Sequence, residues 1–192
     1  MHNFLKTVVS AGLGLVLGLA ATYYSVDRGL GFGAVRAGPW TAWPRAGSVE
    51  IDPYARAALS RTGEAPLGQA EGLSLVAATD TAGNPLRGNC VYTVAGTMPP
   101  ARYWTISVLT REGRVVPNSA NRHGFTSSEI LRRAGGAFSI VLARDAQPGN
   151  WLPTGNATGL LLVLRAYDSP ISATASALTQ QGLPAIERMS CE

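Results

Sequence analysis

The sequence predicts a mainly β protein: a β-sandwich with two or three short helices, preceded by one N-terminal transmembrane helix. Short apolar or alternating runs are separated by turn signals about every ten residues, which is typical of a sandwich. The 192 residues include 22 Gly and 12 Pro at 46% hydrophobic residues, a composition that favours a turn-rich β domain over a helical bundle. Ahead of these runs, Thr7–Tyr24 holds 18 residues without a charge.

The uncharged run is long enough to cross a bilayer as a helix, and Tyr23 and Tyr24 at its end suit the membrane interface. A cleaved signal peptide is the alternative. The apolar stretch is long for a signal peptide, and Gly18-Leu19-Ala20 is an imperfect cleavage site. We therefore expect residues 1–26 to be an uncleaved anchor that holds the protein in a bilayer through residues 7–24.

The charges that flank the anchor disagree about its orientation. Lys6 and the terminal amine favour a cytoplasmic N-terminus, whereas Arg28 and Arg36 favour the opposite topology. Because short N-terminal anchors resemble export signals, we expect a single-pass protein of the bacterial inner membrane with its domain in the periplasm. Gly14 and Gly18 have the spacing that lets helices pack together in a membrane, so a homo-oligomer is one open possibility.

Behind the anchor the chain divides into two parts. Residues 27–48 are rich in Gly, Pro and Trp, and they predict a linker followed by a segment that packs on the domain. Trp40 and Trp43 are too apolar for a free linker, so we expect them to cover an edge of the core. Residues 49–192 then form the β-sandwich domain, a length sufficient for one domain with a sizeable core.

Local patterns place the elements of this domain. Asp52-Pro53 opens a helix, because Asp caps the first turn and Pro suits the first helical position. Thr126-x-x-Glu129 resembles a capping box and predicts a short helix through Arg133, and Ala173–Gln181 predicts another. The remaining runs predict strands at Leu73–Thr79, Cys90–Ala95, Tyr103–Thr110, Phe138–Ala143, Leu160–Leu164 and Ala185–Met189.

The stretch Asn150–Asp168, NWLPTGNATGLLLVLRAYD, is the one around which we expect the domain to be built. Its apolar run Leu160–Leu164 predicts a buried strand, and a loop carrying Asn150 and Trp151 precedes it. In a structural interpretation, Trp151 plugs one end of the sandwich and Asn150 satisfies loop backbone groups. In a functional interpretation, side chains of this stretch line a cleft together with a third aromatic; the candidate cleft residues are Asn150, Trp151, Arg165, Tyr167 and Trp104.

Several pieces of the sequence resemble one bacterial family. NWLP and the strand ending in RAY look like its signature, and the other matching pieces are DPYARA at 52–57, PLG at 66–68, EGL at 71–73, CVYTVAG at 90–96 and RYWTISV at 102–108. Together they span the chain from about Gly38 to its end and resemble the "domain of unknown function 1214" family. The resemblance implies a jelly-roll-like antiparallel β-sandwich and no agreed reaction. In larger relatives a "domain of unknown function 1254" precedes this domain, and we expect a short form without it here.

The chain has two cysteines, Cys90 and Cys191, which exclude a Cys-only zinc site. With His2 and His123 as the only histidines, a metal site is poorly supplied, and we expect neither a metal nor another cofactor. The cysteines are either two buried thiols or one disulfide. Because an exported domain lies in an oxidising compartment, we expect the disulfide.

Charge and motifs exclude several function classes. The formal net charge of +4 comes from scattered Arg residues, which is not the clustered stripe of a nucleic-acid-binding protein. The sequence has neither a GxSxG elbow nor a P-loop, and a triad would need the lone loop residue His123.

We therefore lean against an enzyme and expect a periplasmic binding or interaction module, with an envelope protein or a second copy as partner. A hydrolase-like enzyme with a site built from distant loops is one alternative. The other is an envelope-carbohydrate-binding domain in which Trp104, Trp151 and Tyr167 stack on sugars.

Overall fold

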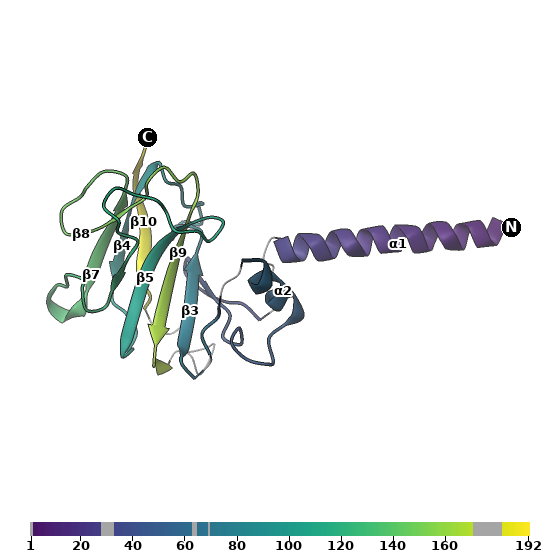
Figure 1. The fold of residues 1–192 in the computed structure, drawn as a ribbon, viewed down its shortest axis with the longest axis horizontal. Helices are drawn as coiled ribbons and strands as arrows, with labels where there is room; N and C mark the ends of the chain where they lie inside the picture. Colours follow the sequence, from purple (N-terminus) through teal and green to yellow (C-terminus); the bar gives the residue numbers. More distant parts are fainter. Residues whose placement is uncertain (1, 28–32, 63–64, 69, 171–181) are drawn as a thin grey trace.

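The computed structural model contains a long helix that projects away from a β-sandwich (Figure 1). The structure describes residues 2–27, 33–62, 65–68, 70–170 and 182–192. The helix, α1 (His2–Asp27), contains the predicted apolar run. By length and composition it is long enough to cross a membrane, and the apolar part is not buried inside the protein.

The sandwich consists of two sheets. In spatial order, the larger sheet contains β1 (Val35–Ala37), β2 (Trp40–Ala42), β3 (Gly72–Ala77), β9 (Leu160–Tyr167), β5 (Tyr103–Thr110) and β6 (Gly124–Thr126). The smaller sheet contains β10 (Ala185–Cys191), β4 (Cys90–Gly96), β7 (Phe138–Ala143) and β8 (Asn150–Pro153). The predicted mainly β architecture is confirmed. The sheets are antiparallel except at one pair, since β8 runs parallel to β7.

The core lies between the two sheets, and β9 is central to it. This strand pairs with β3 on one side and β5 on the other. Leu160, Leu162, Leu164 and Ala166 alternate along it toward the core and are fully buried. They meet buried residues of β4, β7 and β10 in one cluster. The apolar run 160–164 therefore forms the predicted strand, and the period of two in side-chain direction sets which of its residues face inward.

The segment that precedes the predicted domain also enters the larger sheet. β1 and β2 form an antiparallel pair, and β2 continues the sheet from β3. Trp40 in β2 is buried, and its indole N–H donates to the Pro184 carbonyl at 2.8 Å. Because Pro184 leads into β10 of the other sheet, this bond fastens the two sheets together at one edge.

The helix predicted from Asp52-Pro53 is present as α2 (Pro53–Thr62). The Asp52 carboxylate accepts hydrogen bonds from the N–H groups of Tyr54 at 2.9 Å and Ala55 at 3.2 Å, which is the geometry of a helix cap. The helix predicted at 173–181 lies outside the described residues.

The helix predicted at 126–133 is wrong. The expected capping contact forms, because the Glu129 carboxylate accepts from the backbone N–H and the hydroxyl of Thr126 at 3.1 and 2.7 Å. However, Thr126 is the last residue of β6, and the N–H of Ser127 donates to the Trp104 carbonyl in β5. Beyond this point, the N–H groups of Leu131 and Arg133 donate to the Asn150 side chain and to the Ala137 carbonyl instead of to the carbonyls four residues earlier, so no helix forms. Only a short 3-10 turn, η1 (Ala134–Gly136), follows.

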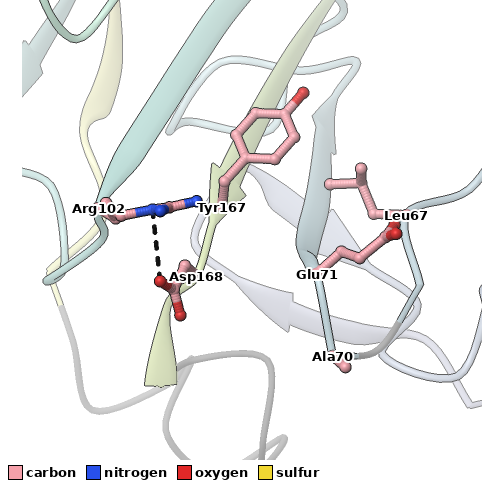
Figure 2. Close-up of a pocket in the computed structure, with 6 residues that line it drawn as sticks. All are labelled: Leu67, Ala70, Glu71, Arg102, Tyr167 and Asp168. Atoms are coloured by element: carbon pink, nitrogen blue, oxygen red, sulfur yellow. Dashed lines mark ion pairs between the residues drawn. The ribbon is translucent and has the colours of Figure 1, made fainter.

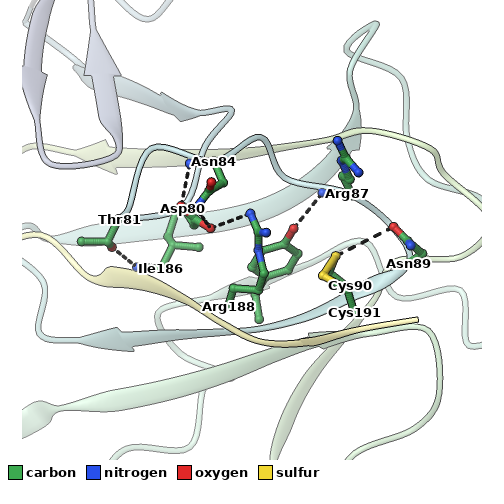
Figure 3. A network of polar contacts seen from close by, with 10 residues as sticks. Asp80, Thr81, Asn84, Arg87, Asn89, Cys90, Ile186, Arg188 and Cys191 are labelled. Atoms are coloured by element: carbon green, nitrogen blue, oxygen red, sulfur yellow. Dashed lines mark hydrogen bonds and ion pairs between the residues drawn. A yellow bond between two sulfur atoms is a disulfide. The ribbon is translucent and has the colours of Figure 1, made fainter.

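The last strand is held to its neighbours by covalent and polar contacts (Figure 3). The predicted disulfide is confirmed: Cys90 in β4 and Cys191 in β10 are register partners and are bonded. Further along β10, the Arg188 guanidinium lies 2.8 Å from the Asp80 carboxylate. These contacts fix β10 along most of its length.

Candidate functional site

The structure does not gather the five candidate cleft residues into one site. Trp104, Arg165 and Tyr167 belong to the larger sheet, whereas Asn150 and Trp151 belong to β8 of the smaller one. Their side chains also differ in environment. Trp104 and Asn150 are buried, and the other three are half-buried.

Asn150 acts as scaffold. Its amide oxygen accepts from the Leu131 N–H at 2.8 Å, and its amide nitrogen donates to the carbonyls of Leu131 at 2.8 Å and Ser139 at 3.0 Å. The side chain therefore provides Leu131 with the donor and acceptor that a neighbouring strand would otherwise offer. This is the structural role that the sequence left open for Asn150.

The two candidate tryptophans are also engaged by the protein. Trp104 stacks on Phe138 with ring centroids 5.1 Å apart, and the Arg132 guanidinium lies 5.8 Å from its ring centroid. Trp151 lies in β8, a strand where the sequence predicted a loop, and its indole N–H donates to the Ala143 carbonyl at 3.0 Å. Burial of Trp104 removes one of the three stacking surfaces on which the carbohydrate-binding alternative depended.

Arg165 and Tyr167 lie on the outer face of the larger sheet, as their spacing predicts. Arg165 is in register with Ser74 of β3 and Thr105 of β5. Tyr167 is in register with Tyr103, and their ring centroids are 6.1 Å apart. The two tyrosines mark the end of the sheet at which β9 finishes and β5 begins.

A pocket opens at this end of the larger sheet, beside Tyr167 (Figure 2). It has a volume of about 350 Å³, within the range of small-molecule sites. Tyr167, Arg102 and Asp168 lie on one side of it, and the chain that leads into β3 lies on the other. The lining residues are Leu67, Ala70, Glu71, Arg102, Tyr167 and Asp168.

Backbone contacts hold the two sides of this pocket together. The Asp168 N–H donates to the Glu71 carbonyl at 2.9 Å, and the Arg102 N–H donates to the Asp168 carbonyl at 3.4 Å. The Glu71 carboxylate accepts from the Gly68 N–H at 3.1 Å and so orders the turn before β3. Glycine is needed at position 72, because a Cβ there would lie 2.1 Å from the Ala166 carbonyl oxygen.

The pocket carries mixed charge. Glu71 and Asp168 supply two carboxylates. The Arg102 guanidinium lies 3.4 Å from the Asp168 carboxylate. The side chains of this ion pair are 80% and 70% exposed, so water screens it and it contributes little to stability. A polar ligand can therefore replace either partner at small cost, while Tyr167 offers it an aromatic surface.

The geometry of the pocket is suited to binding. The described residues of its lining include no Ser, Cys or His that would form an activated nucleophile or a nucleophile–base pair. His123 lies in another loop, where its ring nitrogens are 3.2 Å from the Asn118 amide nitrogen and 3.2 Å from the Asn121 amide oxygen. Among the described residues, no three His, Cys, Asp or Glu side chains are grouped as a metal site.

Comparison with known families decides the relationship. The family model described as "Protein of unknown function (DUF1214)" matches residues 71–171, just over half of the 192 residues. The chain belongs to the DUF1214 family. The resemblance seen in the sequence is thereby confirmed.

One solved structure has a fold similar to that of this chain. The VPA0106 protein from Vibrio parahaemolyticus has a similar structure, with a TM-score of 0.61 at 14% identity over 93% of this chain and 44% of that chain. An uncharacterized protein from Burkholderia cenocepacia matches with a TM-score of 0.41 at 18% identity over 77% of this chain and 46% of that one. The DUF1214 chain thus spans less than half the length of these two proteins. Comparison with curated proteins finds no match.

Of the pocket residues, the sequence singled out Tyr167 alone. A signal for three of the others was present in the family pieces, since PLG contains Leu67, EGL begins with Glu71 and RYWTISV begins with Arg102, while RAY ends with Tyr167 itself. In the DUF1214 structure these pieces meet around one pocket. Each piece also forms part of a strand or turn. Its residues could therefore be explained by the fold alone, and the sequence did not identify them as pocket residues.

Proposed function

We propose that this DUF1214 protein is anchored in the inner membrane by α1 and holds its sandwich in the periplasm as a binding or interaction module. The apolar surface of α1 carries the proposal. Asn3–Val26 is a helix of 24 residues, about 36 Å long at 1.5 Å per residue, which exceeds the roughly 30 Å of a bilayer's hydrocarbon core. Because this window is not buried in the protein, it exposes a continuous apolar surface that is stable only in lipid or against a partner.

The disulfide supports an exported sandwich. Disulfides persist in oxidising compartments such as the periplasm and are rare in the reducing cytosol. The bond joins Cys90 to Cys191, so both lie on the same side of the membrane, in the part of the chain that follows α1. An N-terminal helix followed by an exported domain also fits a cleaved signal peptide, and experiment separates the two.

The pocket beside Tyr167 is the contact site in this proposal. It combines an aromatic surface with exposed charges of both signs, which suits a polar ligand or a partner segment. An envelope protein and a second copy of the chain are the two partner classes that we consider.

Two measurements test the anchor and its topology. An export-dependent reporter fused after Glu192 is expected to be active, and the mature protein is expected to keep α1 and to stay in the membrane after an alkaline wash. A shortened protein released by that wash would show a signal peptide instead. Activity of a cytoplasmic reporter alone would reverse the topology.

Photocrosslinking in cells tests the pocket. A photoreactive phenylalanine analogue replaces Tyr103, whose ring centroid lies 6.1 Å from that of Tyr167, or, as control, the exposed Val115 near the opposite end of β5. We expect adducts at position 103 that are weaker or missing at position 115. We also expect Tyr167→Ala to reduce them in a protein of unchanged melting temperature. Equal adduct patterns at both positions would refute the pocket as the contact site.

A further inference from the structure

We propose that α2 and the turn before it form a platform that lies on the anionic phospholipid headgroups next to the anchor. This inference rests on the proposed function, because it takes α1 to span the bilayer. The platform is defined by the exposed side chains of Arg45, Val49, Tyr54 and Arg56.

The position of α2 along the anchor is the first observation. The uncharged part of α1 runs from Thr7 to Val26, about 30 Å, which matches the hydrocarbon core. Asp27 then emerges at the level of the headgroups. α2 contacts α1 and lies beside its C-terminal end, between the anchor and the sandwich (Figure 1). A spanning α1 therefore places α2 at the membrane surface.

The second observation is an apolar side chain held outward at this level. Val49 is 92% exposed, although backbone and hydroxyl hydrogen bonds order the turn around it. The Ser48 N–H and hydroxyl both donate to the Arg45 carbonyl at 3.0 Å, and the Glu50 N–H donates to the Ser48 hydroxyl at 3.2 Å. An ordered turn that presents an aliphatic side chain is suited to the boundary between headgroups and acyl chains.

Charge selects the kind of lipid. Arg45 and Arg56 are exposed on the platform, and the Arg56 guanidinium donates to the Val49 carbonyl at 3.3 Å, which holds it beside the turn. Two carboxylates lie nearby: that of Asp52 caps the N-terminus of α2, and that of Glu50 is exposed next to Val49, so the two exposed guanidinium groups leave an excess of positive charge over Glu50. Exposed guanidinium groups next to an apolar side chain favour a bilayer with a negative surface.

The platform also brings the pocket near the membrane. Leu67 of the pocket follows the last residue of α2, Thr62, by five positions, so covalent geometry limits their separation to about 18 Å. A ligand or partner segment that enters the pocket therefore binds close to the lipid surface.

Site-directed spin labelling of the full chain in lipid nanodiscs tests this proposal. Single nitroxide labels replace Val49 on the platform, Val115 after β5 as an equally aliphatic exposed control, and Leu15 inside α1. The native cysteines do not interfere, because they are joined in the disulfide. Accessibility to a water-soluble nickel complex and to oxygen then reports the depth of each label.

In nanodiscs that contain phosphatidylglycerol, we expect the Leu15 label to lie in the acyl chains. We expect the Val49 label to collide with the nickel complex several-fold less often than the Val115 label. Arg45→Gln with Arg56→Gln, or nanodiscs of phosphatidylcholine alone, should return the Val49 label toward the accessibility of Val115.

Each contrary result is distinct. A Leu15 label that is open to water refutes the anchor, and the platform falls with it. A Leu15 label in the acyl chains with equal accessibility at 49 and 115 overturns the platform alone. Protection at position 49 that is the same in neutral and anionic nanodiscs overturns the recognition of negative headgroups.

Discussion

Replacing Asp80 is expected to loosen the last strand of the sandwich, because its carboxylate holds two segments that are distant in sequence. The Asp80 side chain is 2% exposed, and it accepts hydrogen bonds of 2.8 Å from the Asn84 N–H and from the Arg188 guanidinium in β10. Burial by itself raises the pKa of this carboxyl. The hydrogen bonds from Asn84 and the charge of Arg188 outweigh burial and hold the pKa below its usual range.

The magnitude follows from these contacts. A hydrogen bond to a charged group contributes roughly 1.5–3 kcal/mol, and removing one partner of a buried ion pair costs roughly 3–5 kcal/mol. Arg188 remains 32% exposed, so water can solvate part of its charge once Asp80 is gone. We therefore expect Asp80→Ala to lower the free energy of unfolding by about 3 kcal/mol, the lower end of that range.

The assay is urea unfolding of the oxidised full chain in detergent, followed by tryptophan fluorescence. Arg114→Ala is the matched control, because the Arg114 side chain is 79% exposed and pairs with Glu112 at 4.0 Å on the surface, and we expect no change from it. An Asp80→Ala protein within about 0.5 kcal/mol of the parent at neutral pH would refute the reasoning.

The pH dependence gives a second test of the same carboxylate. The folded-state pKa of Asp80 is depressed, so its contribution is present above the unfolded pKa of about 3.9 and is lost as the pH falls through the folded value. Asp80→Asn keeps the shape of the side chain and removes the titration. We expect the parent to lose stability more steeply than this variant below about pH 4. Parallel acid profiles would contradict the assignment.

Three further changes are expected to act through different parts of the fold, and the same unfolding assay measures each. Cys191→Ser removes the disulfide between residues 101 positions apart and should lower the free energy of unfolding by about 4–5 kcal/mol in the chain-entropy model. The reduced parent protein should be as unstable as the variant. Asn150→Ala removes three partly buried hydrogen bonds and should cost about 3 kcal/mol at roughly 1 kcal/mol each, so a neutral result would contradict the scaffold role. Gly72→Ala places a Cβ against a backbone carbonyl and should cost about 1–3 kcal/mol, whereas Gly182→Ala, which faces open space, should cost nothing measurable.

The strands predicted best are those in which side-chain alternation and burial act together. The predicted bounds of Tyr103–Thr110 and Phe138–Ala143 match β5 and β7, because both strands present one face to the core along their whole length. The period of two in burial is a local property, so the sequence contains it. The order of the strands in the sheets is set by contacts between distant segments. The alternation of side chains within one strand therefore does not predict that order.

Two local patterns predicted the wrong secondary structure, because partners that are distant in the sequence determine the structure there. The capping box at Thr126 forms its hydrogen bonds, yet the residue pairs with Thr105 of β5 instead of starting a helix. The Asn150–Pro153 stretch contains a Pro and a Trp and predicted a loop, yet it lies beside β7 as a strand. In both cases a neighbouring strand supplies hydrogen-bond partners that lie far away in the sequence.

The pocket shows the same limit at the level of function. Tyr167 was a candidate because it ends a strongly patterned strand, and its side-chain direction followed from the spacing to Arg165. Arg102 reaches it because β5 begins in register with the end of β9, a pairing that the strand order fixes and the local sequence does not. Glu71 joins them through the turn before β3, whose close approach to β9 depends on a glycine that reads in the sequence as an ordinary turn residue. A site assembled from the ends of adjacent strands therefore leaves only isolated residues in the sequence, and the sheet order is needed before they can be grouped.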